Sequence, residues 1–212
     1  FLGIASAKTS FVVTERRSTP CSKPAAADRQ VSLQQAFHQS LAKNAVNLES
    51  CHDGTSGPQY TRELDALVNA KDEGSSSGVI ALHGPPGNGK STFLASWALG
   101  RHNPQEQRHV LTYFVGVTRH STRLSDLLRF LCVQLNEKFK LRHEYIPIAE
   151  RGLLHGLKCM LNQIKDKEDN GDSIAIVVDG VQHLLRENGK LAGLQWVPKV
   201  LPLNVKFIFS IS

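Results

Sequence analysis

Apolar residues are distributed along residues 58–212 in two alternating patterns. Short runs of small or β-branched apolar residues predict buried strands at 79–82, 109–116, 174–179 and 205–211. Between these runs, apolar residues recur at three- and four-residue steps, which predicts amphipathic helices. Strands that alternate with helices favour an α/β fold, a three-layer domain built around a mostly parallel sheet.

The ends of the helices are predicted from capping residues. Thr61 is expected to cap a helix that ends at Val68, and Ser121 or Thr122 is expected to cap a second helix. Pro147 is expected to open a third, because proline is favoured in the first turn of a helix. The apolar stripes that should face the core are Leu64 and Leu67; Leu124, Leu127, Leu128, Leu131 and Leu135; and Leu153, Leu157, Met160, Leu161 and Ile164.

Residues 1–57 lack this alternation. Residues 1–30 mix Ser, Thr, Pro, Ala and basic residues without periodicity, so a disordered basic tail is expected there. Residues 31–57 contain an amphipathic pattern at 31–48 and are expected to form a helical linker. The α/β core then occupies 58–212, and the 41% hydrophobic content of the 212-residue chain is enough for a sizeable core.

The net charge of +6 changes this picture little, because much of the excess lies in the tail. A solvated tail is favoured over a nucleic-acid or membrane partner. Four cysteines without CxxC spacing predict reduced thiols in an intracellular, cytoplasmic protein. No apolar run is long enough to cross a bilayer. Because the chain starts with Phe1 and stops inside an apolar run, we expect it to be a fragment with an incomplete core.

The most specific pattern is Gly84–Ser91, which fits the phosphate-binding pattern G-x-x-x-x-G-K-[ST] at every defined position. Such a loop wraps backbone N–H donors around a polyphosphate and then enters a helix whose positive end faces the anion. Pro85 and Pro86 have no N–H to offer. The donors are therefore expected from Gly87, Asn88, Gly89, Lys90 and Ser91.

Two side chains of this loop have expected roles. Lys90 should reach the β- and γ-phosphates as a point charge, and the Ser91 hydroxyl should ligate Mg²⁺. The alternative is a Gly/Pro turn before an ordinary helix. The apolar run at 79–82 and the helical stripe that follows the loop favour phosphate binding, since strand, loop and helix come in the required order. That stripe consists of Phe93, Leu94, Trp97 and Ala98.

Asp179 stands at the C-terminal end of the run 174–179, where open α/β sheets place their ligands. There a carboxylate can hold Mg²⁺ through water, or it can serve only as a cap or turn residue. One strand separates the loop strand from the Asp179 strand, and another follows. This pattern suits a sheet whose last strand inserts between those two. Ser210 would then be a polar sensor of the γ-phosphate, or a serine that merely ends a strand.

Gly84–Thr92, the segment 178–180 and the strand ending at Ser210 together resemble the NACHT-type group of signal-transducing (STAND) phosphate-loop ATPases. Within that group, further segments resemble the nucleotide domains of telomerase protein component 1 and nephrocystin-3: Tyr113–Gly116, Asn188–Leu191 and Trp196–Lys199. The resemblance implies a P-loop NTPase core that binds ATP and Mg²⁺. It also places Thr92 in the nucleotide site and Arg62 near the adenine side.

The resemblance implies a switch domain in a large multidomain scaffold or signalling protein, whose other regions bind proteins. This chain departs from the family where one or two acids often follow the strand aspartate, because Gln182 and His183 stand there. They are the candidates for a catalytic role, with Glu187 further along the chain. We therefore expect slow or absent ATP hydrolysis. The alternatives are an active ATPase with turnover and an interaction module that has lost its nucleotide; a nucleic-acid partner stays open, and no membrane partner is expected.

Overall fold

The computed structural model describes the part of the chain in which the α/β domain was predicted. The described residues are 57–70, 78–101, 108–118, 120–165 and 173–212. The predicted tail (1–30) and the amphipathic pattern at 31–48 lie outside the described residues, so the predictions made for them stay predictions.

The elements follow the predicted alternation of strands and helices. In chain order they are α2 (Gly57–Asn69), β1 (Val79–His83), α3 (Lys90–Gly100), β2 (Arg108–Phe114), α4 (Leu124–Phe139), α5 (Glu150–Lys165), β3 (Ser173–Asp179), the 3₁₀ helix η3 (Val181–His183) and β4 (Val205–Ile211). Within the described ranges, none of the helices is both long enough and apolar enough to span a membrane.

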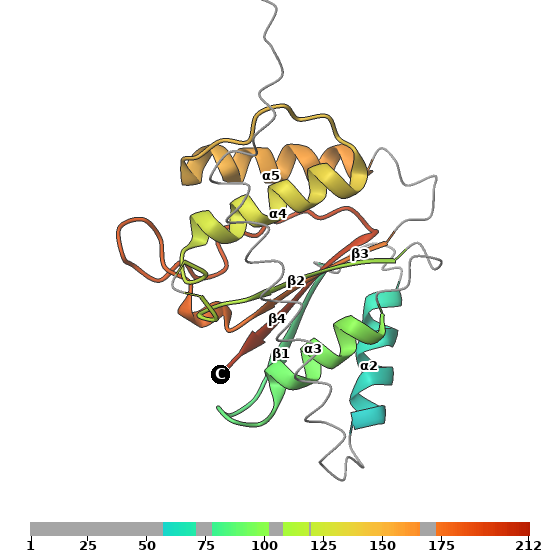
Figure 1. Ribbon diagram of the computed structural model, residues 1–212. Coiled ribbons are helices and arrows are strands. Elements are labelled where there is room, and N and C mark those ends of the chain that lie inside the picture. Colours follow the sequence, from blue (N-terminus) through green and yellow to red (C-terminus); the bar gives the residue numbers. More distant parts are fainter. Residues whose placement is uncertain (1–56, 71–77, 102–107, 119, 166–172) are drawn as a thin grey trace, which may run out of the picture.

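The strands form a parallel sheet in the order β1-β4-β3-β2 (Figure 1). The last strand therefore lies between the strand that precedes the loop and the strand that ends in Asp179, as the sequence predicts. In this register Leu82 pairs with Ser210, and Phe114 pairs with Asp179. The strand ends that carry the loop, Asp179 and Ser210 thus meet at one edge of the sheet, where α/β sheets bind ligands.

Helices cover both faces of the sheet, with α2 and α3 on one side and α4 and α5 on the other (Figure 1). Successive side chains of a strand point to opposite faces, so each strand supplies both interfaces. In β3, Ile176 and Val178 belong to the apolar cluster of α4 and α5, whereas Ala175 and Val177 belong to that of α2 and α3. The predicted three-layer α/β arrangement is confirmed.

The prediction for α2 is wrong in two respects. The helix begins at Gly57, so Thr61 lies inside it and does not cap it. Leu67 is 54% exposed, and Val68 takes the buried position beside Leu64. Residues three and four positions away share a helix face almost equally well, so the spacing alone did not decide between the two neighbours.

The start of α4 also differs from the prediction. The helix begins at Leu124 with Arg123 as its N-cap and without a side-chain capping bond, so neither Ser121 nor Thr122 caps it. The buried Ser121 hydroxyl instead closes a turn, because it donates to the carbonyl oxygen of Thr118 at 2.9 Å. The leucine stripe predicted for α4 is fully buried, as expected.

The helix α5 begins at Glu150, three residues after Pro147. Pro147 packs against the first turns of α5: a Cβ atom added to Gly152 would lie only 2.8 Å from the Cβ atom of Pro147. The proline therefore precedes the helix and packs on it, instead of opening it. The apolar stripe predicted for α5 is buried in full.

Two of the four cysteines, Cys132 and Cys159, lie in the described part of the chain, and both are free thiols. Cys132 is buried between α4 and α5, with its Sγ atom 3.8 Å from the carbonyl oxygen of Leu153. Burial raises the pKa of the Cys132 thiol to about 12. Because the thiolate is the reactive form, Cys132 is a packing residue and not a nucleophile.

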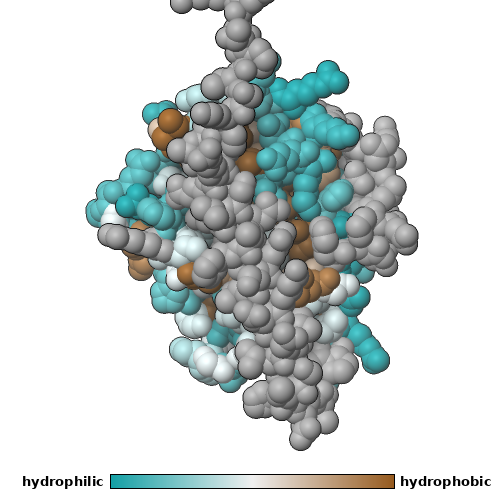
Figure 2. Space-filling model, viewed as in Figure 1, coloured by the Kyte–Doolittle hydropathy of each residue, from teal (hydrophilic) through white to brown (hydrophobic). Residues whose placement is uncertain are grey.

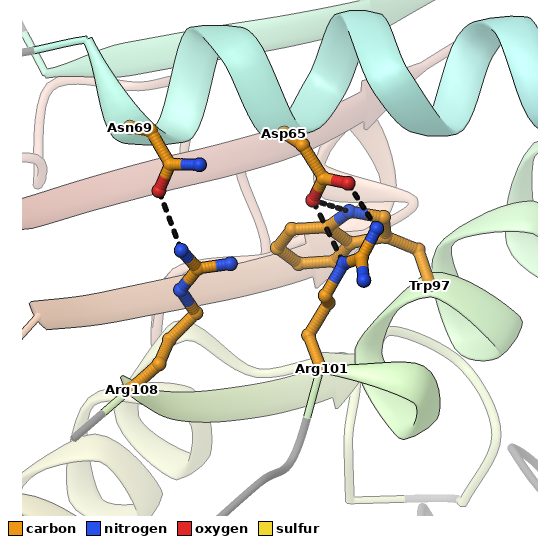
Figure 3. Close-up of polar contacts among 5 residues, drawn as sticks. All are labelled: Asp65, Asn69, Trp97, Arg101 and Arg108. Atoms are coloured by element: carbon orange, nitrogen blue, oxygen red, sulfur yellow. Dashed lines mark hydrogen bonds and ion pairs between the residues drawn. The ribbon is translucent and has the colours of Figure 1, made fainter. Parts of the chain in front are cut away.

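A polar cluster ties α2 to its neighbours (Figure 3). Asp65 accepts hydrogen bonds from Trp97 Nε1 at 3.0 Å and from Arg101 Nε at 2.8 Å, and its second oxygen pairs with the guanidinium of Arg101. One turn further along α2, Asn69 accepts a hydrogen bond from Arg108 at the start of β2. Since Trp97 and Arg101 come from α3 and its end, the cluster fixes the helix that follows the phosphate loop.

Candidate phosphate-binding site

The loop between β1 and α3 has the backbone that its glycines predict. Gly87 and Gly89 have φ angles of +82° and +73°, in the left-handed region that favours glycine. A Cβ atom at either position would meet nothing within 4 Å, so the backbone conformation, and not lack of space, requires glycine there. The loop is also tied to the sheet, because the amide of Gly84 donates to the carbonyl oxygen of Ile211 at 3.3 Å.

Lys90, the first residue of α3, folds back over the loop. Its Nζ atom donates to the carbonyl oxygens of Gly84 at 2.6 Å and Pro85 at 2.7 Å. An ammonium group has three N–H donors, and these bonds use two of them. The lysine is thereby held with its charge at the loop, at the positive end of α3.

Asp179 is the centre of the site, because both of its carboxylate oxygens accept hydrogen bonds from hydroxyl groups. Ser91 Oγ donates to Oδ2 at 2.7 Å, and Ser210 Oγ donates to Oδ1. Ser210 is 3% exposed, and its oxygen also accepts a hydrogen bond from the backbone N–H of Gly180 at 2.8 Å. The loop, β3 and β4 are thus joined through one carboxylate.

These groups line a cavity of about 430 Å³ at the C-terminal ends of the strands. The residues that line it are Pro86, Gly87, Gly89, Lys90, Ser91, Thr92, Val115, Asp179, Gly180, Gln182, His183, Ser210 and Ser212. Asp179 is the single carboxylate among these lining residues. Three elements far apart in sequence therefore converge on one polar cavity that has one fixed cation and one acid.

The donor set of this cavity fits a polyphosphate with Mg²⁺. Backbone amides at the start of α3 and the Lys90 ammonium suit phosphate oxygens. The hydroxyl of Ser91 and the carboxylate of Asp179 are the hard oxygen ligands that Mg²⁺ prefers. In the described ranges, no group of three or more His, Cys, Asp or Glu side chains could hold a metal alone. A cation here would depend on phosphate oxygens and water, as Mg²⁺ usually does in phosphate-loop sites.

The two residues predicted as candidates for catalysis both lie on η3 at the cavity. Gln182 places its Oε1 atom in a buried position with no hydrogen-bond partner in the structure, and His183 is exposed. Glu187 lies elsewhere: its Oε1 atom accepts a hydrogen bond from the backbone N–H of Glu150 at 3.3 Å, at the start of α5. The structure therefore brings Gln182 and His183 to Asp179 and leaves Glu187 out.

The other predicted site residues divide in the same way. Thr92 lines the cavity. Gly84 and Asn88 belong to the loop but are not among the lining residues; Arg62, exposed on α2, is not among them either. Sequence reasoning missed Val115, whose backbone N–H donates to the carbonyl oxygen of Asp179 at 3.0 Å. Its position near the C-terminal end of the predicted strand 109–116 was the signal that could have found it.

The parallel sheet, the glycine loop that leads into α3 and the converging Asp179 define a P-loop NTPase-like domain. Comparison with known families is consistent with this class: the model of the family described as "Nephrocystin 3, N-terminal" matches residues 57–210. The chain belongs to this family. The match covers the whole described sheet except for its last residue, Ile211.

The curated relatives are more distant. The chain is 23% identical over 154 residues to tetratricopeptide repeat protein 41 of Mus musculus and 24% identical over 158 residues to that of Rattus norvegicus. Each alignment covers 69% of this chain and 12% of the relative, so the chain spans about an eighth of their length. Among solved structures, a Walker-type ATPase of Pyrococcus abyssi matches with a TM-score of 0.43 and 15% identity, covering 74% of this chain and 45% of that one.

Proposed function

We propose that residues 58–212 form an ATP-binding switch domain of the NACHT-type STAND class, inside a larger scaffold or signalling protein. One observation carries the proposal: Ser91 Oγ donates a hydrogen bond to Asp179 Oδ2 at 2.7 Å, which joins the phosphate loop and the strand acid in one cavity. Family membership supports it, because the matched residues contain both the loop and the acid.

Each side chain of the cavity has a role in this proposal. The backbone amides from Gly87 to Ser91 hold the phosphates of the nucleotide, and Lys90 adds a fixed positive charge. Ser91 and Asp179 would hold Mg²⁺, the serine through its hydroxyl and the aspartate through water. When bound, the metal neutralises charge on the β- and γ-phosphates. Ser210 keeps Asp179 in place through the hydrogen bond to Oδ1.

The adenine side of the nucleotide is assigned to the region around the start of α2. The rings of Tyr60 on α2 and Phe93 on α3 are 6.5 Å apart, edge to face, so the first turns of α2 lie next to the helix that follows the loop. Arg62 is exposed two residues further along α2. This neighbourhood supports a role for Arg62 near the base or ribose.

Slow hydrolysis follows from the carboxylate content of the cavity. Attack on a γ-phosphate needs a water that is oriented and relieved of its proton, which is usually the task of a second acid. Asp179 is the single carboxylate among the lining residues, and its two oxygens are engaged by Ser91 and Ser210. Gln182 can orient a water but cannot take its proton. We infer a site that holds ATP for long periods, as a switch requires.

The experiment that tests nucleotide binding is Lys90→Ala in the full-length protein, measured by isothermal titration calorimetry with Mg-ATP. The affinity should fall at least tenfold, about 1.4 kcal/mol, because the substitution removes the fixed cation at the phosphates. Lys199→Ala is the matched control, since Lys199 is exposed and outside the cavity. Equal affinities for wild type and Lys90→Ala would refute the proposed site.

Hydrolysis is tested by Gln182→Asp in single-turnover measurements on the full-length protein. The variant should hydrolyse bound ATP faster than the wild type, because general-base catalysis contributes roughly a hundredfold or more. His183→Ala should change the rate little, since the His183 side chain is exposed to solvent. A fast wild-type rate, or a large loss in His183→Ala, would place the protein among the active ATPases instead.

The surroundings of this domain are also part of the proposal. The matched relatives carry the name tetratricopeptide repeat protein, and this chain corresponds to about an eighth of each. The domain would then be a small part of a longer, intracellular protein. Its nucleotide state would be reported to protein-binding regions elsewhere in that protein. The nucleotide is thus the partner of the described cavity, and other proteins are the partners of the whole molecule.

A further inference from the structure

The exposed face of α5 carries basic and neutral polar side chains and no acid. Its exposed residues are Arg151, His155, Lys158, Asn162, Gln163 and Lys165. Arg151, Lys158 and Lys165 follow one another at seven-residue steps, about 10.5 Å apart along the helix axis. The sole acid of α5, Glu150, is turned to Arg186, whose NH1 atom lies 3.3 Å from Glu150 Oε1. The positive charge of this face is therefore not neutralised from within the helix.

The segment 140–149, between α4 and α5, runs back along α5 and extends this face. His143 Nε2 lies 2.9 Å from Gln163 Oε1 near the C-terminal end of α5, and Pro147 packs on Gly152 near its start. The side chain of Asn136 on α4 fixes the segment through two hydrogen bonds, one to the carbonyl oxygen of His143 at 2.9 Å and one from its N–H at 3.0 Å. The segment is thus a formed part of the surface.

The segment presents both cations and apolar side chains. Lys140 and Arg142 have φ angles of +49° and +60°, a backbone region that costs of order 1 kcal/mol for residues other than glycine. Tyr145 and Ile148 are 71% and 75% exposed. Figure 2 shows hydrophilic side chains gathered over the end of the molecule that α5 occupies in Figure 1. Lys140 is the C-cap that ends α4. Arg142 has no such role in a helix end, and its strained backbone beside exposed apolar groups is the kind of feature found at binding surfaces.

We propose that the exposed face of α5 and the segment 140–149 form a docking surface, the α5 face, for an acidic protein segment with an apolar anchor. Protein interfaces place exposed tyrosine and apolar residues at their centre and charged residues at their rim. Tyr145 and Ile148 supply the apolar groups, and the exposed cations supply the charge. Residues 140–165 contain five Lys and Arg residues but only two acids. One of these acids, Glu150, is paired with Arg186.

The cations of this surface require a partner with negative charge. The exposed apolar groups indicate whether that partner is a protein or a nucleic acid. Single-stranded nucleic acid would also be attracted by the cations and could stack on Tyr145. An exposed isoleucine, however, gives a nucleic acid nothing to stack on, whereas an apolar side chain of a protein gains by covering it. The α5 face shares no residue with the lining of the nucleotide cavity, so this inference does not depend on the proposed function.

The test uses a fluorescein-labelled helical peptide with glutamates at seven-residue steps and leucines beside them, with binding to the full-length protein followed by fluorescence anisotropy. The double variant Arg151→Glu with Lys158→Glu should bind it at least tenfold more weakly, because two attractions become repulsions. The matched control Lys190→Glu with Lys199→Glu changes the net charge equally at exposed residues elsewhere and should bind normally. Tyr145→Ser with Ile148→Ser should weaken binding about threefold or more through lost apolar burial.

Three outcomes would overturn the proposal. Equal weakening of peptide binding in the two charge variants would show a general effect of net charge and no specific role for the α5 face. Absence of peptide binding to the wild type would show that this chemistry is not recognised. Tighter binding of a labelled oligouridylate than of the peptide, lost in Arg151→Glu with Lys158→Glu, would make the α5 face a nucleic-acid surface instead.

Discussion

The two faces of the sheet are held to their helices in different ways. On the α4 and α5 side the contacts are apolar: the inward leucines of α4, among them Leu128 and Leu131, are completely buried. On the α2 and α3 side the apolar cluster is smaller, and α2 depends in addition on the polar cluster of Asp65 with Trp97 and Arg101. The candidate site lies at the C-terminal edge of the sheet, and its phosphate loop leads into α3 of the second side. The molecule thus combines a tightly packed scaffold face with a second face whose helix α3 begins at the site.

The largest expected effect concerns the scaffold face. Leu131→Ala in α4 should lower the free energy of unfolding by about 3 kcal/mol, because it leaves a cavity among fully buried side chains. Urea denaturation followed by circular dichroism measures the change. Leu67→Ala in α2 is the control, since Leu67 is largely exposed and should cost little. Comparable losses of unfolding free energy in the two variants would contradict the difference in packing between the two faces of the sheet.

A smaller effect is expected from the polar cluster of the other face. Asp65→Ala should lower the free energy of unfolding by about 2 kcal/mol, because the buried Trp97 Nε1 and the Arg101 guanidinium lose a charged partner. We further expect α2 to detach before the rest of the domain, which hydrogen exchange would reveal as lost protection over 57–69. Asp65→Asn should keep part of the stability, since an amide oxygen can still accept one of these bonds. A uniform loss of protection over all helices would contradict a local role.

The smallest effect on stability, and the most specific effect on function, is expected at Ser210. Ser210→Ala should lower the free energy of unfolding by about 1 kcal/mol, because Asp179 Oδ1 and the Gly180 N–H each lose a hydrogen-bond partner. The gain in ATP affinity that Mg²⁺ provides should shrink, since the carboxylate is less well positioned. Calorimetry with and without Mg²⁺ measures this gain. An equal loss of affinity in both conditions would leave Ser210 with a structural role only.

Much of the fold was predictable because its signals are local in sequence. The strands, their order and the strand-loop-helix unit around Lys90 follow from apolar runs and one loop pattern. Asp179 was predictable because strand ends meet at one edge of a parallel sheet. The N-terminus of α4 was not, because the capping preference of Ser121 competes with its turn at Thr118, and the turn is favoured in the fold.

The parts that the sequence did not predict depend on pairings between distant residues. Asp65 and Arg101 are 36 positions apart, and neither position carries a local signal for the other. The partner of Ser210 is another such case, because a strand-end serine could face either a ligand or the neighbouring strand, and here its hydroxyl reaches Asp179. Two further roles concern ligands and stay predictions. Arg62 is predicted to lie near the adenine base, and Gln182 is predicted to orient a water molecule.

The central position of β4 has a consequence for how this domain is synthesised. A ribosome releases the chain from its N-terminus, so β1, β2 and β3 emerge before β4, which lies between β1 and β3. In the described sheet β1 pairs with β4 alone, so the phosphate loop cannot take its place until residues 205–211 have left the exit tunnel. Until then the nascent polypeptide exposes unpaired backbone N–H and C=O groups at the edges of β1 and β3, together with apolar side chains, and we expect chaperones to shield them. Nucleotide capture would therefore distinguish chains that have released β4 from chains stalled before it.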